Sequence, residues 1–130
     1  MATERTYAWV EHLEEGGVEQ LVLRLLDDQT FFFLHATYHN NWGERSEQSE
    51  RYSGTYEVRE EVIVCHATRL KRVTRVEDRD WNKKDKSIKH MDIDQEMVFV
   101  QRGSNELVCP VDAFDARVLN KKEEPYPGVF

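Results

Sequence analysis

Cysteine, glycine and proline are scarce in this chain, and long apolar runs are missing. Its 130 residues include 2 cysteines, 6 glycines and 3 prolines. With no secretory signal before them, Cys65 and Cys109 are interpreted as reduced core thiols rather than a disulfide framework. The N-terminal sequence MATERTY has no apolar signal core, and no run approaches the ~20 apolar residues of a membrane span. We therefore expect a cytoplasmic protein with no membrane segment.

Basic residues are also fewer than acidic residues in this chain. The formal net charge is −7, from 18 Lys and Arg against 25 Asp and Glu. Residues 1–43 hold seven acids and two arginines, a net of −5, so the remainder is nearly balanced. An acidic protein repels phosphate backbones, which argues against nucleic acid as the partner. Hydrophobic residues make up 39% of the chain, which suits the core of one globular domain.

An amphipathic helical period is absent, and a period of two dominates instead. Apolar residues that alternate between polar turns predict antiparallel strands. We expect strands at 7–10, 18–26, 30–40, 54–58, 62–76, 88–93, 96–101 and 106–109. Residues 43–53 and 78–87 are interpreted as loops, and 111–120 as a last strand or a helical turn.

This pattern predicts an all-β fold. About eight strands in sequential hairpins favour an antiparallel up-and-down meander closed into a small barrel. We place the barrel at residues 1–120 and an extended tail at 121–130. An open two-layer α+β domain would require an amphipathic helix, which no window supplies.

Two motifs carry a resemblance to a known family. The segments LRLLDDQTFFF (23–33) and GTYEVREEVI (54–63) resemble the patterns L-x-L-x-x-D-G-T-F and G-T-W-x-V-x-G-D-x-I. These patterns are found in small lipocalin-like (calycin-type) β-barrel domains. The resemblance covers about residues 20–68, and Gln29 and Glu60 stand where the patterns have glycine. It implies a closed antiparallel barrel, a fold that hosts carriers, inhibitors, assembly factors and a few isomerases.

The turn at Asp27–Gln29 decides which side chains face inward. If this loop has three residues, Leu25 faces Phe31 across the hairpin. The inward set is then Leu21, Leu23, Leu25, Phe31, Phe33, His35, Thr37 and His39. A two-residue loop would turn Phe32, Leu34, Ala36 and Tyr38 inward, because a one-residue slip exchanges the faces. The family-like pattern favours the first arrangement.

In that arrangement the barrel interior is the candidate ligand site. Its predicted lining is Phe31, Phe33, His35, His39, Tyr56, Val58 and Ile63. These residues offer an apolar cavity with polar groups to orient a small apolar or aromatic ligand. The phenylalanines are also large enough to fill an eight-stranded barrel, which would leave no cavity.

The same strands are apolar on their outer side, which is unusual for a barrel wall exposed to water. The predicted partner patch consists of Phe32, Leu34, Tyr38, Val62 and Val64. An apolar surface of this kind requires a cover. The candidates are the chain's own C-terminal segment 111–130, a second copy in a homodimer, or a protein partner.

The histidines do not form a metal-binding pattern. His35 and His39 share a strand face but are separated by about 13 Å. A single metal needs ligand atoms about 2 Å away, and the neighbours Cys65 and His66 point to opposite faces. The sequence places no Ser or Cys beside a His as a nucleophile–base pair. We therefore predict no metal site, no catalytic residues and no cofactor.

A basic segment, RLKRVTRVEDRDWNKKDKSIKH (69–90), contains nine Lys or Arg and four acids. Arg69, Lys71 and Arg75 share one strand face, and Arg72 lies on the other. The pattern suits binding of a phosphate or of single-stranded nucleic acid. The usual explanation of such a pattern is a solvated strand whose charges discourage edge pairing.

Three functions fit these observations. The first is a non-catalytic module that binds a small apolar or aromatic ligand in a barrel cavity. The second is an accessory or assembly protein that binds another protein through the apolar outer wall. The third is a barrel-type isomerase or lyase. An empty cavity inside the barrel would favour the first function over the second.

Overall fold

The structure, a computed structural model, describes residues 5–13, 16–41, 44–78, 83–103, 105–109 and 117–122. These residues form eight strands and no helix. The strands are β1 (Arg5–Leu13), β2 (Gly17–Leu25), β3 (Thr30–Asn41), β4 (Glu44–Arg59), β5 (Val62–Asp78), β6 (Lys83–Arg102), β7 (Glu106–Val108) and β8 (Val118–Lys122). In this part of the chain, no helix is long and apolar enough to cross a membrane. Most of the predicted tail and of the predicted covering segment 111–130 lies outside the described residues.

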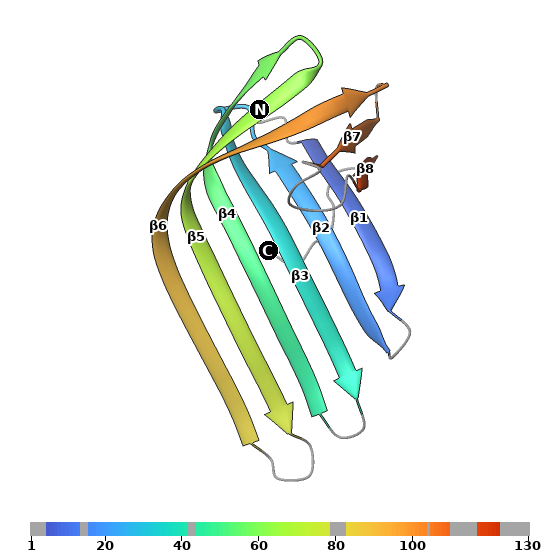
Figure 1. Cartoon of the computed structure of the whole chain (residues 1–130), viewed down its shortest axis with the longest axis vertical. Coiled ribbons are helices and arrows are strands. Elements are labelled where there is room, and N and C mark those ends of the chain that lie inside the picture. Colours follow the sequence, from blue (N-terminus) through green and yellow to red (C-terminus); the bar gives the residue numbers. More distant parts are fainter. Residues whose placement is uncertain are drawn as a thin grey trace.

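The strands form a closed antiparallel ring, as predicted. Each strand pairs with the next, and β8 returns to pair with β1. Closure is confined to one end, because β8 pairs with β1 only at Thr6–Ala8 and β7 pairs with β6 only at Val100–Arg102. Figure 1 shows β7 and β8 as short strands beside one end of a curved sheet of long strands. We call the end that contains β7 and β8 the closed half, and the remainder the open half.

The β2–β3 hairpin has the three-residue loop. Leu25 lies opposite Phe31, and Leu23 lies opposite Phe33. The Leu26 N–H donates to the Thr30 carbonyl at 3.0 Å, which leaves Asp27 to Gln29 as the loop. The first of the two predicted arrangements is therefore confirmed.

The core fills the inner side of the closed half. Within it Phe33 packs against Phe99, with ring centroids 5.3 Å apart in an edge-to-face arrangement. The buried members are Tyr7, Leu21, Leu23, Leu25, Phe31, Phe33, Ile63, Cys65, Ala67, Met97, Phe99, Leu107, Cys109 and Leu119. Both cysteines are unbridged, as predicted. Val58, expected in this core, is instead 47% exposed near the end of β4, although Ile63 opposite it on β5 is buried.

β5 contains a bulge near Thr68. Beyond the bulge, the alternation of its side chains between the two sheet faces is shifted by one residue. Gly54 pairs with Ala67 and Ser53 pairs with Arg69, so Thr68 has no opposite residue on β4. A bulge of this kind re-aims the side chains that follow it. A Cβ atom at Gly54 would overlap the His66 carbonyl oxygen, so the close approach of β4 and β5 requires glycine there.

The loops predicted at 43–53 and 78–87 are wrong for most of their length. Residues 44–53 pair with β3 on one side and with β5 on the other. Residues 83–87 begin β6, a single strand where two had been predicted. These segments lie in the open half, where both sheet faces carry mostly polar side chains. The alternation of apolar residues that marks a half-buried strand is therefore missing.

Gln29 is the first test of the hairpin. Its φ is +69°, in the left-handed region that favours glycine. Replacing Gln29→Gly should raise the free energy of unfolding by about 0.5–1 kcal/mol, because the strain exceeds the entropy that glycine adds to the unfolded chain. Urea denaturation measures the change. Gln29→Ala, which retains the strain, should not stabilise the protein, and an equal gain in both variants would contradict this reading of the turn.

The buried thiols make a second prediction. Burial raises the pKa of Cys65 and of Cys109 from 9.0 to about 12. The unfolded chain thus loses these protons before the folded chain does, and the free energy of unfolding should fall as pH rises from 9 to 12. Urea denaturation across this range should show a shallower fall for the Cys65→Ala/Cys109→Ala variant. Rapid labelling of native thiols near neutral pH would contradict their burial.

Candidate functional site

The inner face changes from apolar to polar over three cross-strand rows that run from β1 to β6. The apolar row is Tyr7, Leu23, Phe33, Tyr52, Leu70 and Met91. The next row, which we call the boundary row, is Trp9, Leu21, His35, Glu50, Arg72 and Lys89. The polar row beyond it is Glu11, Glu19, Thr37, Gln48, Thr74 and Ser87. The polarity changes where the ring passes from its closed half to its open half.

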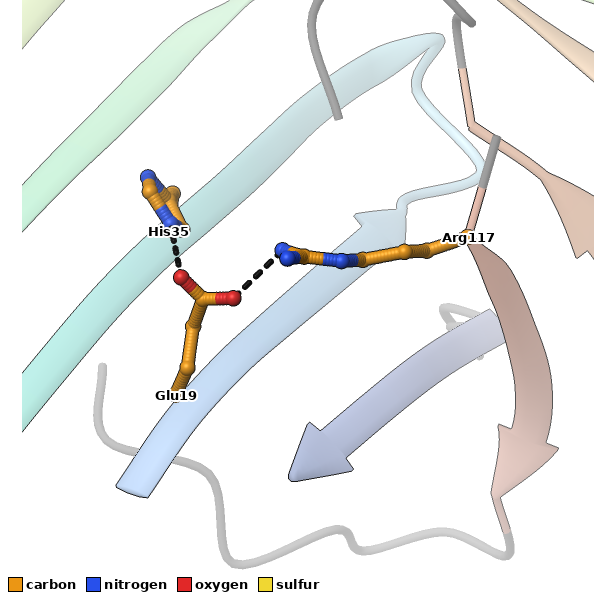
Figure 2. Close-up of polar contacts among 3 residues, drawn as sticks. All are labelled: Glu19, His35 and Arg117. Carbon is orange, nitrogen blue, oxygen red and sulfur yellow. Dashed lines mark hydrogen bonds and ion pairs between the residues drawn. The ribbon is translucent and has the colours of Figure 1, made fainter. Parts of the chain in front are cut away.

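A carboxylate cluster lies at this boundary. Glu19 Oε1 is 2.5 Å from Arg117 Nη1, and Glu19 Oε2 is 3.3 Å from His35 Nε2. Figure 2 shows the Glu19 carboxylate between the other two side chains. The exposed fractions are only 18% for Glu19, 25% for His35 and 24% for Arg117. The Arg117 guanidinium lies 4.3 Å from the centroid of the Trp9 ring. This cluster joins the residue before β8 to the inner face of β1, β2 and β3.

A second ion pair continues the boundary row. Arg72 Nη2 donates to Glu50 Oε2 at 3.1 Å, next to a hollow of about 180 Å³. The hollow is lined by His35, Thr37, Gln48, Ser49, Glu50, Arg72 and Thr74. Burial and, to a smaller extent, Glu50 raise the pKa of the neighbouring Tyr52 hydroxyl. Tyr52 therefore stays protonated and presents an aromatic ring beside charged groups.

The boundary row places charged side chains beside an aromatic ring. Arg72, Lys89 and Arg117 are matched in number by the carboxylates Glu11, Glu19 and Glu50 in and beside the boundary row. Positive charge is concentrated at one end of this row, where Arg72 and Lys89 lie opposite each other on β5 and β6, near the Tyr52 ring on β4. Within the described ranges, no three His, Cys, Asp or Glu side chains come together as a metal site. The cysteines, with pKa values of about 12, are poor nucleophiles.

Of the predicted cavity residues, His35 alone lies in the boundary row. Phe31, Phe33 and Ile63 have no exposed surface, so they fill the closed half. The Tyr56 hydroxyl donates to the Leu26 carbonyl at 2.7 Å and ties β4 to the β2–β3 turn. His39 pairs with Gly17 and Ser46, farther into the open half. Val58 lies exposed at the end of its hairpin, as described above.

Sequence reasoning missed Trp9, Glu19, Glu50, Arg72 and Arg117 as a group. Glu19 carried a weak signal, because it is the one acid in a mostly apolar strand segment, VEQLVLRLL. Glu50 was assigned to a loop, and Arg117 fell in a segment left undecided between strand and helical turn. Pairing of successive strands brings Trp9, Glu19, Glu50 and Arg72 to one face, and closure of the ring adds Arg117.

The predicted partner patch is not a single exposed surface. Leu34 is 2% exposed and belongs to a second buried cluster, on the outer side of β1, β2 and β3, with Ala8, Val22 and Ala36. Tyr38 packs against this cluster, and Val62 and Val64 are half-buried. Phe32, at 38%, is the most exposed member of the patch.

Comparison with known proteins found no family model, no curated protein and no solved structure that matches this chain. The geometry of the inner face is therefore the guide to function. That geometry combines a filled apolar core, a boundary row of mixed charge and a polar open half.

A double-mutant cycle on Glu19 and Arg117 tests the cluster. Because the pair is mostly buried, Glu19→Gln and Arg117→Gln should show a coupling energy of about 1–2 kcal/mol in urea denaturation. The matched control is the exposed pair Arg102–Glu106, whose atoms are 2.7 Å apart. Its coupling should stay below about 0.5 kcal/mol. Equal coupling in the two pairs would mean that Glu19 and Arg117 are effectively solvated.

Proposed function

We propose that the protein is a non-catalytic binding module for a small ligand that has an aromatic or apolar body and an anionic group. The ligand binds at the boundary row of the inner face. The observation that supports this most is the change from apolar to polar side chains where the ring opens. A ligand with one apolar and one charged end matches that change in polarity.

The residues at the boundary row define how such a ligand would lie. Its aromatic body contacts the ring of Tyr52, which borders the filled core. Its anionic group lies toward Arg72 and Lys89, adjacent on β5 and β6. Lys89 is exposed and has no ion pair with the part of the chain that the structure describes. The side chains Phe31 and Phe33 hold the floor of the site and do not touch the ligand.

The lipocalin-like resemblance supports this proposal at the level of fold. Both positions where the chain lacks the glycine of the family pattern retain a left-handed backbone, with φ of +69° at Gln29 and +54° at Glu60. The hairpins thus keep the shape for which the family pattern uses glycine. Two free thiols agree with a reducing, cytoplasmic location.

Fluorescence titration with anilinonaphthalene sulfonate tests the proposal, because this dye joins an aromatic body to an anionic group. The folded protein should bind it with saturation. Arg72→Gln should weaken binding about tenfold, since a charge-assisted hydrogen bond contributes about 1.5–3 kcal/mol.

Arg102→Gln is the matched control, because Arg102 is also an exposed arginine in an ion pair but lies outside the inner-face site. It should leave the affinity unchanged, and thermal melts should show that all variants are folded. Equal affinity of wild type and Arg72→Gln would reject the boundary row as the site. Self-association that Phe32→Lys abolishes, without dye binding, would favour the protein-partner alternative.

A further inference from the structure

A row of basic side chains crosses the outer face of the sheet, on the side opposite to the boundary row. Arg51 on β4 lies opposite Lys71 on β5, and Lys71 lies opposite His90 on β6. Figure 1 shows these three strands side by side. Directly opposite residues in an antiparallel sheet have Cβ atoms about 5 Å apart, and like charges in such positions are destabilising. The row therefore needs a source of compensating negative charge.

Neighbouring acids supply this compensation only in part. The adjacent row contains Ser53, Arg69 and Asp92, so it adds a third strong cation, Arg69, and one carboxylate, Asp92, directly opposite it. Neither Arg69 nor Lys71 has an ion pair in the described part of the chain. Arg51 already has an interaction within the protein, so Arg69 and Lys71 are the cations available to a ligand. This concentration of positive charge occurs in a protein of net charge −7.

These side chains surround a hollow rather than a flat surface. Its volume is about 460 Å³. Six of its lining residues belong to the two outer-face rows, namely Arg51, Ser53, Arg69, Lys71, His90 and Asp92, and the other two, Leu70 and Met91, belong to the apolar row of the inner face. The bulge at Thr68 lies at its edge, where β5 changes the face it presents. Bulges re-aim side chains and are frequent beside binding sites. The volume lies within the range of about 300–1,000 Å³ that is typical of small-molecule sites.

We propose that this hollow binds the phosphate group of a small phosphorylated molecule. Arg69 donates from its guanidinium and Lys71 from its ammonium group, and the Ser53 hydroxyl supplies a neutral donor on the same face. The volume leaves room for an organic group beside the phosphate. This site is distinct from the inner-face site, because residues that alternate along β5, such as Lys71 and Arg72, lie on opposite faces.

A small molecule fits these observations better than a nucleic acid does. A nucleic-acid surface uses a continuous cationic track with several phosphate contacts. Here Asp92 interrupts the second row, and Arg75, farther along the same face of β5, is within 3.9 Å of Glu47. The positively charged surface is therefore confined to the surroundings of the hollow and does not form a continuous track.

Two-dimensional NMR titration with inorganic phosphate and with a nucleoside monophosphate, at low ionic strength, tests this site. Saturable shifts should appear at Ser53, Arg69 and Lys71. Lys71→Gln and Arg69→Gln should each weaken binding about tenfold, because each removes a charge-assisted hydrogen bond. Lys71→Arg should preserve binding, and Lys121→Gln, an exposed lysine on β8, should have no effect. Both test residues lie on the outer face, and NMR spectra of the free variants would confirm that they fold.

Three results would overturn the proposal. The first is the absence of saturable shifts with either phosphate compound. The second is an equal loss of affinity in Lys71→Gln and Lys121→Gln, which would reflect overall charge only. The third is binding of a single-stranded oligonucleotide, with a steep dependence on salt, by a protein that does not bind the mononucleotide.

Discussion

The pairing of Leu25 with Phe31 across the β2–β3 turn determines the rest of the structure. This register places Leu21, Leu23 and Phe33 on the inner face with it. A shift by one residue would exchange the two faces, turning Phe32 inward and His35 out of the boundary row. The core of the closed half and the inner-face site therefore depend on one three-residue loop, which keeps its left-handed backbone at Gln29 without a glycine.

Incomplete closure divides one sheet into two environments. Where β7 and β8 complete the ring, the inner face is buried and carries phenylalanine, leucine and cysteine side chains. Where β6 pairs only with β5 among the described strands, the same face is open to water and carries acids, amides and hydroxyls. Arg117 connects the two environments, because it precedes β8 and reaches Glu19 on β2. A ligand at their boundary can satisfy both kinds of surface, and this is the basis for the proposed binding function.

Sequence patterns predicted the fold where strands have one buried face, and failed where neither face is buried. The hairpin of β2 and β3 and the inward set from Leu21 to Phe33 followed from alternation and turn chemistry. Residues 44–53 were interpreted as a loop, because polar side chains on both faces leave no period to detect. The bulge at Thr68 has no signal in its own sequence, and the only hint of it is Gly54 on the neighbouring strand. The contact between Glu19 and Arg117 depends on closure of the ring. The site was thus less predictable than the fold, because its residues become neighbours only in three dimensions.

The most direct test of this account is NMR measurement of backbone contacts between β2 and β3. Non-hydrogen-bonded antiparallel pairs bring opposite Hα atoms close enough for strong nuclear Overhauser effects, because their Cα atoms are about 4.5 Å apart. The account predicts that contacts across this hairpin follow the register in which Leu23 lies opposite Phe33 and Leu21 lies opposite His35. A pattern shifted by one residue, with Leu23 opposite Phe32 or Leu34, would contradict the inner face, the boundary row and the binding function proposed for it.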